Sequence, residues 1–92
     1  MTSDSETNTQ EAIGIYLAPN PVDDYLDVEL FLPFSDSFSV TVFNDLGQLL
    51  FQNDYMNTHF IRIPTHSFQG GIYFLKVQSQ GFVQIEKFTC AR

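Results

Sequence analysis

The sequence has few of the residues that cross-link a small protein. Among its 92 residues there are one cysteine, Cys90, and two histidines. A single cysteine cannot form an intrachain disulfide, and no cluster of Cys and His has the spacing of a metal site. The fold must therefore depend on its apolar core, and we expect no bound metal and no cofactor.

Positive charge is scarce and unevenly distributed. Four Lys and Arg stand against 11 Asp and Glu, which gives a net charge of −7. Residues 1–60 contain none of the four cations, which are Arg62, Lys76, Lys87 and Arg92. Nucleic acids and anionic membranes attract basic surfaces, so we expect neither as a partner. The asymmetry reflects either chance plus an acidic N-terminal segment, or a partner of opposite charge that meets the last strands.

Long apolar runs are missing as well. No segment approaches the ~20 apolar residues of a membrane helix, so we expect no membrane insertion. Residues 1–12 have neither the basic start nor the apolar stretch of a signal peptide, and their composition is typical of a flexible polar linker. We therefore predict a single folded domain over residues 13–92.

The sequence does have short stretches in which apolar and polar residues alternate. Such a period of two places successive side chains on opposite faces of a β-strand. The pattern is clearest over residues 25–32, with Leu26, Val28, Leu30 and Leu32 in phase. A central strand is predicted from Gly71 to Val77, with one face made of Tyr73, Leu75 and Val77. If Gly71 packs its backbone close to a neighbouring strand, Gly71→Val should destabilise the fold more than Gly70→Ala. The Tyr73 hydroxyl is expected to bond nearby backbone at a corner of the fold.

Five further strands are predicted, at residues 13–17, 38–43, 48–52, 59–63 and 82–90. Residues 53–57 are predicted to form a loop. Asn44 to Gly47 is predicted to be a hairpin turn with Gly47 at positive φ. About seven short strands, turn signals every ~8–12 residues and no helical period favour an all-β fold, an antiparallel immunoglobulin-like β-sandwich.

The first and last strands are both expected at sheet edges. Pro19 and Pro21 cannot donate ladder hydrogen bonds, so the strand before them is predicted to be an edge strand. The last strand has an ambiguous phase, because apolar residues lie on both of its faces: Val83 and Ile85 on one, and Phe82, Phe88 and Cys90 on the other. A bulge or a two-sided environment would explain it. An unprotected last strand predicts a weak homodimer through residues 82–90.

Few residues suggest chemistry. Neither His59 nor His66 lies beside a Ser or Cys in a known nucleophile motif, so we expect no catalytic residue. Asp23, Asp24 and Asp27 lack calcium-loop spacing and are better explained as turn residues. Cys90 is expected to be a packed thiol. Some large apolar side chains are predicted to point away from the core; they are Phe31, Phe43, Ile72 and Phe74. We expect a second layer of the protein to cover them. The alternative is that they form an exposed patch that binds a partner.

Four segments together indicate a family. They are Pro19-Asn20-Pro21 before an alternating strand, Val40-Thr41-Val42-Phe43-Asn44-Asp45-Leu46-Gly47-Gln48, Phe68-Gln69-Gly70-Gly71-Ile72-Tyr73, and a lysine-bearing terminal strand. In order and spacing they resemble the C-terminal sorting domain of the type IX secretion system of Bacteroidota, over about residues 14–92. The family often has adjacent basic residues in the last strand, where this chain has Glu86 beside Lys87.

The resemblance implies an export signal. After transit into the periplasm, an outer-membrane translocon would recognise the domain, and a surface sortase would remove it by cleavage before Ile13. The cargo would be an N-terminal domain of a longer precursor, secreted or held at the cell surface. By position, the resemblance implies a sorting-signal motif of Pro19, Asn20, Pro21, Gly71, Tyr73 and Lys87.

Two other functional classes are compared with this one. The first is a small immunoglobulin-like module that presents Phe31, Phe43 or Phe74 to a glycan or a protein. A contiguous aromatic patch on one face would favour it. The second is an enzyme, which we do not expect, because no nucleophile and base and no metal ligands occur in a catalytic pattern.

Overall fold

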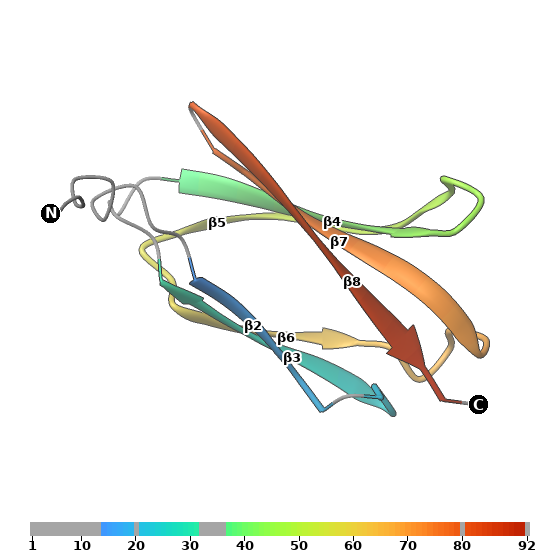
Figure 1. Cartoon of the computed structure of the whole chain (residues 1–92). Coiled ribbons are helices and arrows are strands. Elements are labelled where there is room, and N and C mark those ends of the chain that lie inside the picture. Colours follow the sequence, from blue (N-terminus) through green and yellow to red (C-terminus); the bar gives the residue numbers. More distant parts are fainter. Residues whose placement is uncertain (1–13, 20, 32–36, 80, 92) are drawn as a thin grey trace, which may run out of the picture.

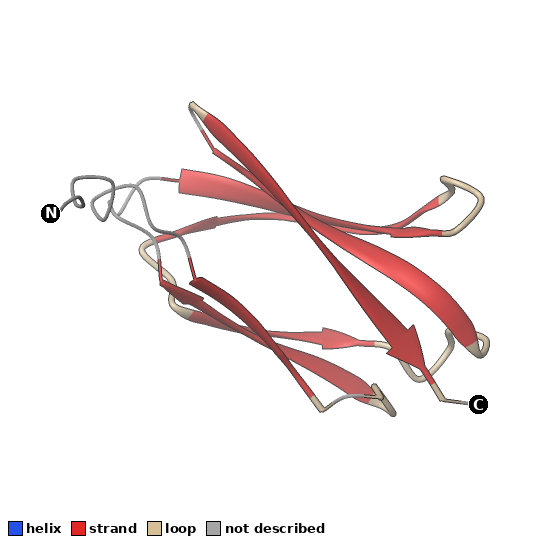
Figure 2. Cartoon of the chain, viewed as in Figure 1, coloured by secondary structure: helices blue, strands red, loops and turns tan. Residues whose placement is uncertain are grey.

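The computed structural model describes residues 14–19, 21–31, 37–79 and 81–91. Within these ranges the chain forms seven strands and no helix (Figures 1 and 2). The strands are β2 (Gly14–Ala18), β3 (Tyr25–Phe31), β4 (Ser37–Asn44), β5 (Leu49–Met56), β6 (Phe60–Pro64), β7 (Gly71–Ser79) and β8 (Phe82–Cys90). The predicted linker at residues 1–12 lies outside the described residues.

The strands make two antiparallel sheets that face each other (Figure 1). One sheet has the order β2-β3-β6 and the other has the order β5-β4-β7-β8. β2 is an edge strand, as its prolines predict, and β7 is central, between β4 and β8. The prediction of an all-β antiparallel sandwich of about seven strands is therefore confirmed.

The core lies between the two sheets and is built from the in-phase apolar residues. Leu26, Val28 and Leu30 of β3 are fully buried, and so are Leu75 and Val77 of β7. Each such side chain contributes about 1.5–3 kcal/mol relative to an exposed one. Tyr73, the third in-phase residue of β7, is buried too, whereas Leu32 lies outside the described residues. The core also contains Val40, Val42, Ile61 and Ile63.

The predicted loop at residues 53–57 is wrong over most of its length. β5 continues to Met56, and Asn53 pairs with Val40 while Tyr55 pairs with Phe38. The polar residues of this stretch concealed the strand, because β5 is a sheet edge where polar side chains can remain in water. Tyr55 supplies the missing apolar contact by stacking on Phe38, with ring centroids 5.7 Å apart.

The hairpin between β4 and β5 has the predicted geometry. Gly47 has a φ of 83°. The Asn44 side-chain oxygen accepts hydrogen bonds from the backbone N–H groups of Leu46 and Gln48, each at 2.9 Å. These bonds form between residues close in sequence, so the turn could be predicted from Asn44 to Gly47 alone.

The last strand has neither the bulge nor the two-sided environment that was expected to explain its phase. β8 pairs with β7 in one unbroken register, from Gly71 opposite Cys90 to Ser79 opposite Phe82. Phe88 and Cys90 are buried in the core, whereas Ile85 is exposed on the outer face. The expected packed thiol of Cys90 is thus confirmed as a buried side chain.

The expected second layer over the outward aromatic residues is not found. Among the described residues the strands form two layers only, so both outer faces meet solvent. Phe31 is 53% exposed and Ile72 is 43% exposed, while Phe43 and Phe74 are half-buried. Phe31 lies on the three-stranded sheet and the other three lie on the four-stranded sheet, so they do not form one patch.

Asp27 and Arg62 form an ion pair across β3 and β6. The guanidinium donates two hydrogen bonds to the carboxylate, from Nε at 2.7 Å and from Nη2 at 3.2 Å. This hydrogen bonding lowers the pKa of Asp27 and raises the pKa of Arg62. The pair uses the fork geometry that suits a carboxylate.

Asp27→Asn is expected to cause a small loss of stability at neutral pH that disappears in acid. Because Arg62 lowers the pKa of Asp27 in the folded state, the pair stabilises the fold above the unfolded pKa, and this contribution is lost as pH falls through the folded pKa. The effect is small because the pair is exposed to solvent. Urea midpoints at neutral pH and at about pH 2 test this, and an equal difference at both would contradict it.

Candidate functional site

The segment between β2 and β3 pairs directly with the last strand. The Val22 N–H donates to the Thr89 carbonyl at 2.8 Å, and the Ala91 N–H donates to the Val22 carbonyl at 3.2 Å. They form a parallel bridge between Val22 and Cys90, and Val22 is fully buried. Because Val22 follows a strand of one sheet and β8 belongs to the other, the bridge joins the two sheets near the C-terminus (Figure 1).

Thr65 closes the same end of the sandwich. Its side chain is fully buried, and its Oγ1 donates to the Asp23 carbonyl at 2.7 Å. Its backbone N–H donates to the Asp24 carbonyl at 2.8 Å, and its carbonyl accepts from the Phe68 N–H at 2.9 Å. The loop after β6 is thereby fixed to the segment that follows Val22, with its buried polar groups satisfied.

Tyr73 is the central ring of an aromatic stack at this end. Its ring lies 5.0 Å from that of Phe68 and 5.6 Å from that of Phe88, both nearly parallel to it. Its hydroxyl donates a hydrogen bond to the Gln69 carbonyl. The predicted bond between this hydroxyl and nearby backbone is confirmed, and it anchors the turn that leads into β7.

Gly71 begins β7 opposite Cys90 and has a φ of 152°, which L side chains rarely adopt. The condition of close packing against a neighbouring strand is not met, since a Cβ at Gly71 would meet nothing within 4 Å. Glycine is required here by the backbone conformation and not by lack of space.

Gly71→Val is expected to lower the free energy of unfolding by about 1–3 kcal/mol, because valine would hold the backbone in a strained conformation. Gly70→Ala is the matched control, since Gly70 does not have a positive φ. Urea unfolding of both variants measures the difference. Equal midpoints would show that the φ of Gly71 imposes no cost.

Lys87 lies on the outer face of the four-stranded sheet, opposite Phe74 in the register. Lys76 lies on the same face, with its Nζ 5.5 Å from the centroid of the Phe43 ring. In the described part of the chain neither lysine forms an ion pair with a carboxylate. The outer face of the four-stranded sheet therefore has two lysines, each near a half-buried aromatic ring, that can contact a negatively charged partner.

The structure brings most of the predicted motif to one end of the sandwich. Pro19 and Pro21 are exposed in the segment that leads into Val22, and Gly71 and Tyr73 pair with the end of β8. Lys87 belongs to the same strand end, but it lies on the opposite face from the Tyr73 stack. Asn20 lies outside the described residues.

The sequence reasoning missed the residues that join these segments. Val22 is the one apolar residue between Pro21 and Tyr25, and this was the only feature of the sequence that could have indicated its burial. Thr65 gave no signal, because a threonine after a proline is ordinary in a loop. Phe88 could have been assigned to the core, because it has the same strand phase as Cys90, which was expected to be packed.

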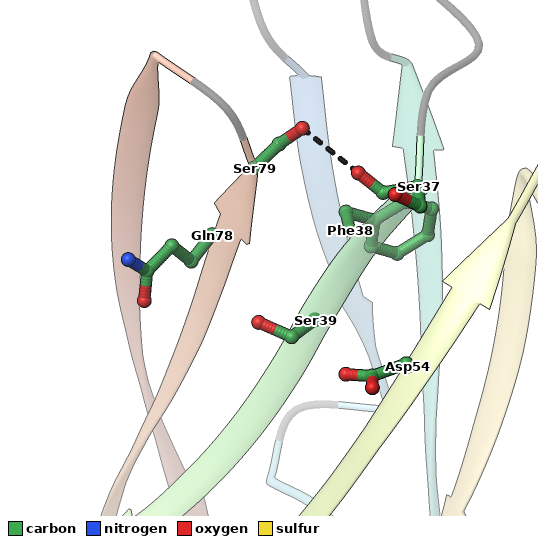
Figure 3. Close-up of a pocket in the computed structure, with 6 residues that line it drawn as sticks. All are labelled: Ser37, Phe38, Ser39, Asp54, Gln78 and Ser79. Carbon is green, nitrogen blue, oxygen red and sulfur yellow. Dashed lines mark hydrogen bonds between the residues drawn. The ribbon is translucent and has the colours of Figure 1, made fainter.

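A shallow polar groove lies at the other end of the four-stranded sheet (Figure 3). Figure 3 shows the Ser39 hydroxyl and the Asp54 carboxylate on paired strands, and a hydrogen bond of 2.9 Å from the Ser79 hydroxyl to the Ser37 carbonyl. The other residues of its lining are Phe38 and Gln78. These groups can donate and accept hydrogen bonds.

The described residues contain no group of three or more His, Cys, Asp and Glu side chains that could hold a metal ion. The carbonyls of Asp23 and Asp24 accept the bonds from Thr65, and the carboxylate of Asp27 pairs with Arg62. In the same ranges we find no helix with the length and apolar composition to cross a membrane.

Comparison with known proteins gives one family. Residues 14–90 match the secretion system C-terminal sorting domain, and no curated protein matches the chain. The matched span contains all seven strands and the three segments that meet at the C-terminal end. The chain therefore belongs to the C-terminal sorting domains of the type IX secretion system, which mark an attached N-terminal cargo for secretion or for the cell surface.

Proposed function

We propose that this domain carries its cargo from the periplasm through the outer-membrane translocon, and that the translocon contacts the C-terminal end of the sandwich. The observation that supports this is the meeting of the proline segment, the start of β7 and the end of β8 at one place. These segments are far apart in sequence, so a partner that reads them together requires the folded domain.

Charge supports a partner surface that carries carboxylates. The domain is acidic overall, yet Lys87 and Lys76 face solvent without an ion pair among the described residues. Complementary charge speeds association and favours one orientation of a complex. We therefore assign Lys87 to the contact with the translocon, with Pro19 and Pro21 beside the end of the same strand.

The domain itself is proposed to be non-catalytic and to act as a substrate of the surface sortase. Its N-terminal segment, residues 1–12, is polar in sequence, and proteolytic cleavage concentrates in terminal segments of small and polar residues. Cleavage in this segment would separate the cargo from the sandwich and leave the cargo at the cell surface or in the medium.

A reporter fusion tests the proposal. Residues 13–92 are fused to the C-terminus of a reporter with a periplasmic targeting signal, in a host with this secretion system. We expect the reporter at the cell surface or in the medium, and a control fusion to residues 1–12 alone should remain in the periplasm. Equal periplasmic retention of both fusions would refute an export function.

Two single substitutions on β8 test the role of Lys87. Lys87→Gln and Val83→Glu both make the net charge more negative by one, and both positions lie on the exposed outer face of the strand. We expect Lys87→Gln to reduce export several-fold and Val83→Glu to have little effect. Equal export of the two variants would exclude a specific contact at Lys87.

A truncation of the terminal strand is less informative than these point variants. Deletion of residues 86–92 should keep the reporter in the periplasm, but it also removes Phe88 and Cys90 from the core and the partners of Val22. Loss of export would then reflect an unfolded end as well as a lost contact. Circular dichroism of the truncated domain separates the two causes.

Sortase removal has its own readout. The mass and C-terminal peptide of the exported reporter should show cleavage within residues 1–12 when these are included in the fusion. If the fusion were found uncleaved at the cell surface, the export proposal would stand and removal by the sortase would be refuted.

The predicted homodimer remains a separate proposal. In the described ranges β8 pairs with β7 along one side only, apart from the bridge to Val22 at its end. Its other edge can therefore add a strand from a second copy. Light scattering at high concentration should show a dimer, and a strict monomer would refute it.

A further inference from the structure

The outer face of the three-stranded sheet carries a group of exposed aromatic side chains. Tyr16 is 60% exposed, Phe60 is 55%, Phe31 is 53% and Tyr25 is 47%. Among the Phe and Tyr residues whose exposure is described, these are all that are more than about a third exposed, and all four point outward from β2, β3 and β6. We call this surface the aromatic face.

A carboxylate lies between two of these rings. Glu29 of β3 is directly opposite Tyr16 of β2 on one side and Phe60 of β6 on the other. The two rings are therefore two strand spacings apart, about 10 Å. A ligand that spans them passes over Glu29, whose carboxylate can accept hydrogen bonds from it.

The row two residues further along these strands is Ala18, Asp27 and Arg62, and the Tyr25 ring lies beside it on β3. Asp27 and Arg62 are paired in this row, and the Arg62 guanidinium lies 5.2 Å from the centroid of the Tyr25 ring. No Val, Leu, Ile or Met occurs among the outward residues of this face, which are Gly14, Tyr16, Ala18, Tyr25, Asp27, Glu29, Phe31, Phe60, Arg62 and Pro64.

Gly14 holds part of the aromatic face in place. A Cβ at Gly14 would lie 2.9 Å from Cε2 of Tyr16 and 3.4 Å from Cβ of Phe31. The Tyr16 ring therefore lies over the backbone of β2, in edge contact with Phe31 at a centroid distance of 5.7 Å. The position of this ring depends on the absence of a side chain at residue 14.

We propose that the aromatic face binds a neutral, linear glycan. A sugar ring offers C–H groups that pack on an aromatic ring, and hydroxyls that bond to carboxylates and guanidinium groups. Two rings about 10 Å apart match neighbouring sugars of a chain that crosses the strands. Glu29 and Asp27 lie on the middle strand of this face, and acidic residues are depleted in the core of protein interfaces. The net charge of −7 disfavours an anionic ligand.

This binding function is distinct from the export signal, because it uses the opposite sheet from Lys87. The experiment titrates the full 92-residue chain with a panel of neutral linear oligosaccharides, including cellohexaose and N-acetylchitohexaose, by isothermal calorimetry. Dextran sulfate and polylysine are added as charged probes. We expect saturable binding of at least one neutral oligosaccharide.

Three variants locate the site. Tyr16→Ala and Phe60→Ala should each weaken binding of that oligosaccharide at least tenfold, and Gly14→Ala should weaken it while leaving every ring present. Ile85→Ala, an equally exposed position on the outer face of the other sheet, should bind as the parent does. Unchanged urea midpoints show that the variants fold, since none of these positions lies in the core.

Several results would overturn the proposal. They are no binding to any neutral oligosaccharide of the panel, binding that Tyr16→Ala and Phe60→Ala leave unchanged, and binding to polylysine or dextran sulfate alone. The last result would show non-specific charge attraction. Export of the reporter fusion is measured separately, so failure of glycan binding leaves the export proposal intact.

Discussion

Tyr73→Ala is expected to lower the free energy of unfolding by about 3–5 kcal/mol, which is a large part of the stability of a domain this small. The substitution removes the middle ring of the stack with Phe68 and Phe88, and with it the hydrogen bond to the Gln69 carbonyl. The loss comes from a cavity and from broken ring contacts at the end where the two sheets are joined.

Tyr73→Phe separates these two contributions. Phenylalanine keeps the ring and loses only the hydroxyl, so it should cost about 1 kcal/mol. Urea unfolding followed by circular dichroism measures both variants. If Tyr73→Phe were as destabilising as Tyr73→Ala, the hydrogen bond and not the stack would stabilise this end.

Val22→Asp is expected to cost about 3–5 kcal/mol, because it places an uncompensated charge in a fully buried position. Val22→Ala should cost about 2 kcal/mol, through lost burial and the cavity that remains. Both changes act on the bridge to Thr89 and Ala91, so both should speed hydrogen exchange of the Ala91 amide, which bonds to the Val22 carbonyl.

Val83→Asp is the matched control for Val22→Asp. It introduces the same side chain on β8 at a position that is 53% exposed, and surface changes of this kind shift stability by only about 0.5 kcal/mol. If the two aspartate variants unfolded at the same urea concentration, or if exchange at Ala91 did not respond to Val22→Asp, the bridge would have no role in holding the last strand.

The sequence predicted the parts of the fold that depend on local pattern. Alternation identified the buried faces of β3 and β7, and Asn44 to Gly47 identified a turn whose hydrogen bonds are all local. The hydrogen bond of Tyr73 was predicted for the same reason, because its acceptor Gln69 is only four residues away. Signals of this kind do not depend on which strands become neighbours.

The features that were missed depend on pairing between distant segments. The stretch from Asn53 to Met56 is a strand only because β4 offers it an edge. Val22 has its role only because β8 passes beside it, and the aromatic face exists only because β2 and β6 both pair with β3. Strand order is not encoded in spacing along the chain, so these sites required the structure.

The central claim is that this folded domain directs export, and one measurement tests it most directly. The fraction of the reporter found outside the cell is compared for the same 13–92 fusion in a host with an intact type IX translocon and in one that lacks it. We predict a large outside fraction in the first host and a background fraction, with the reporter accumulating in the periplasm, in the second. Equal outside fractions in the two hosts would contradict the claim.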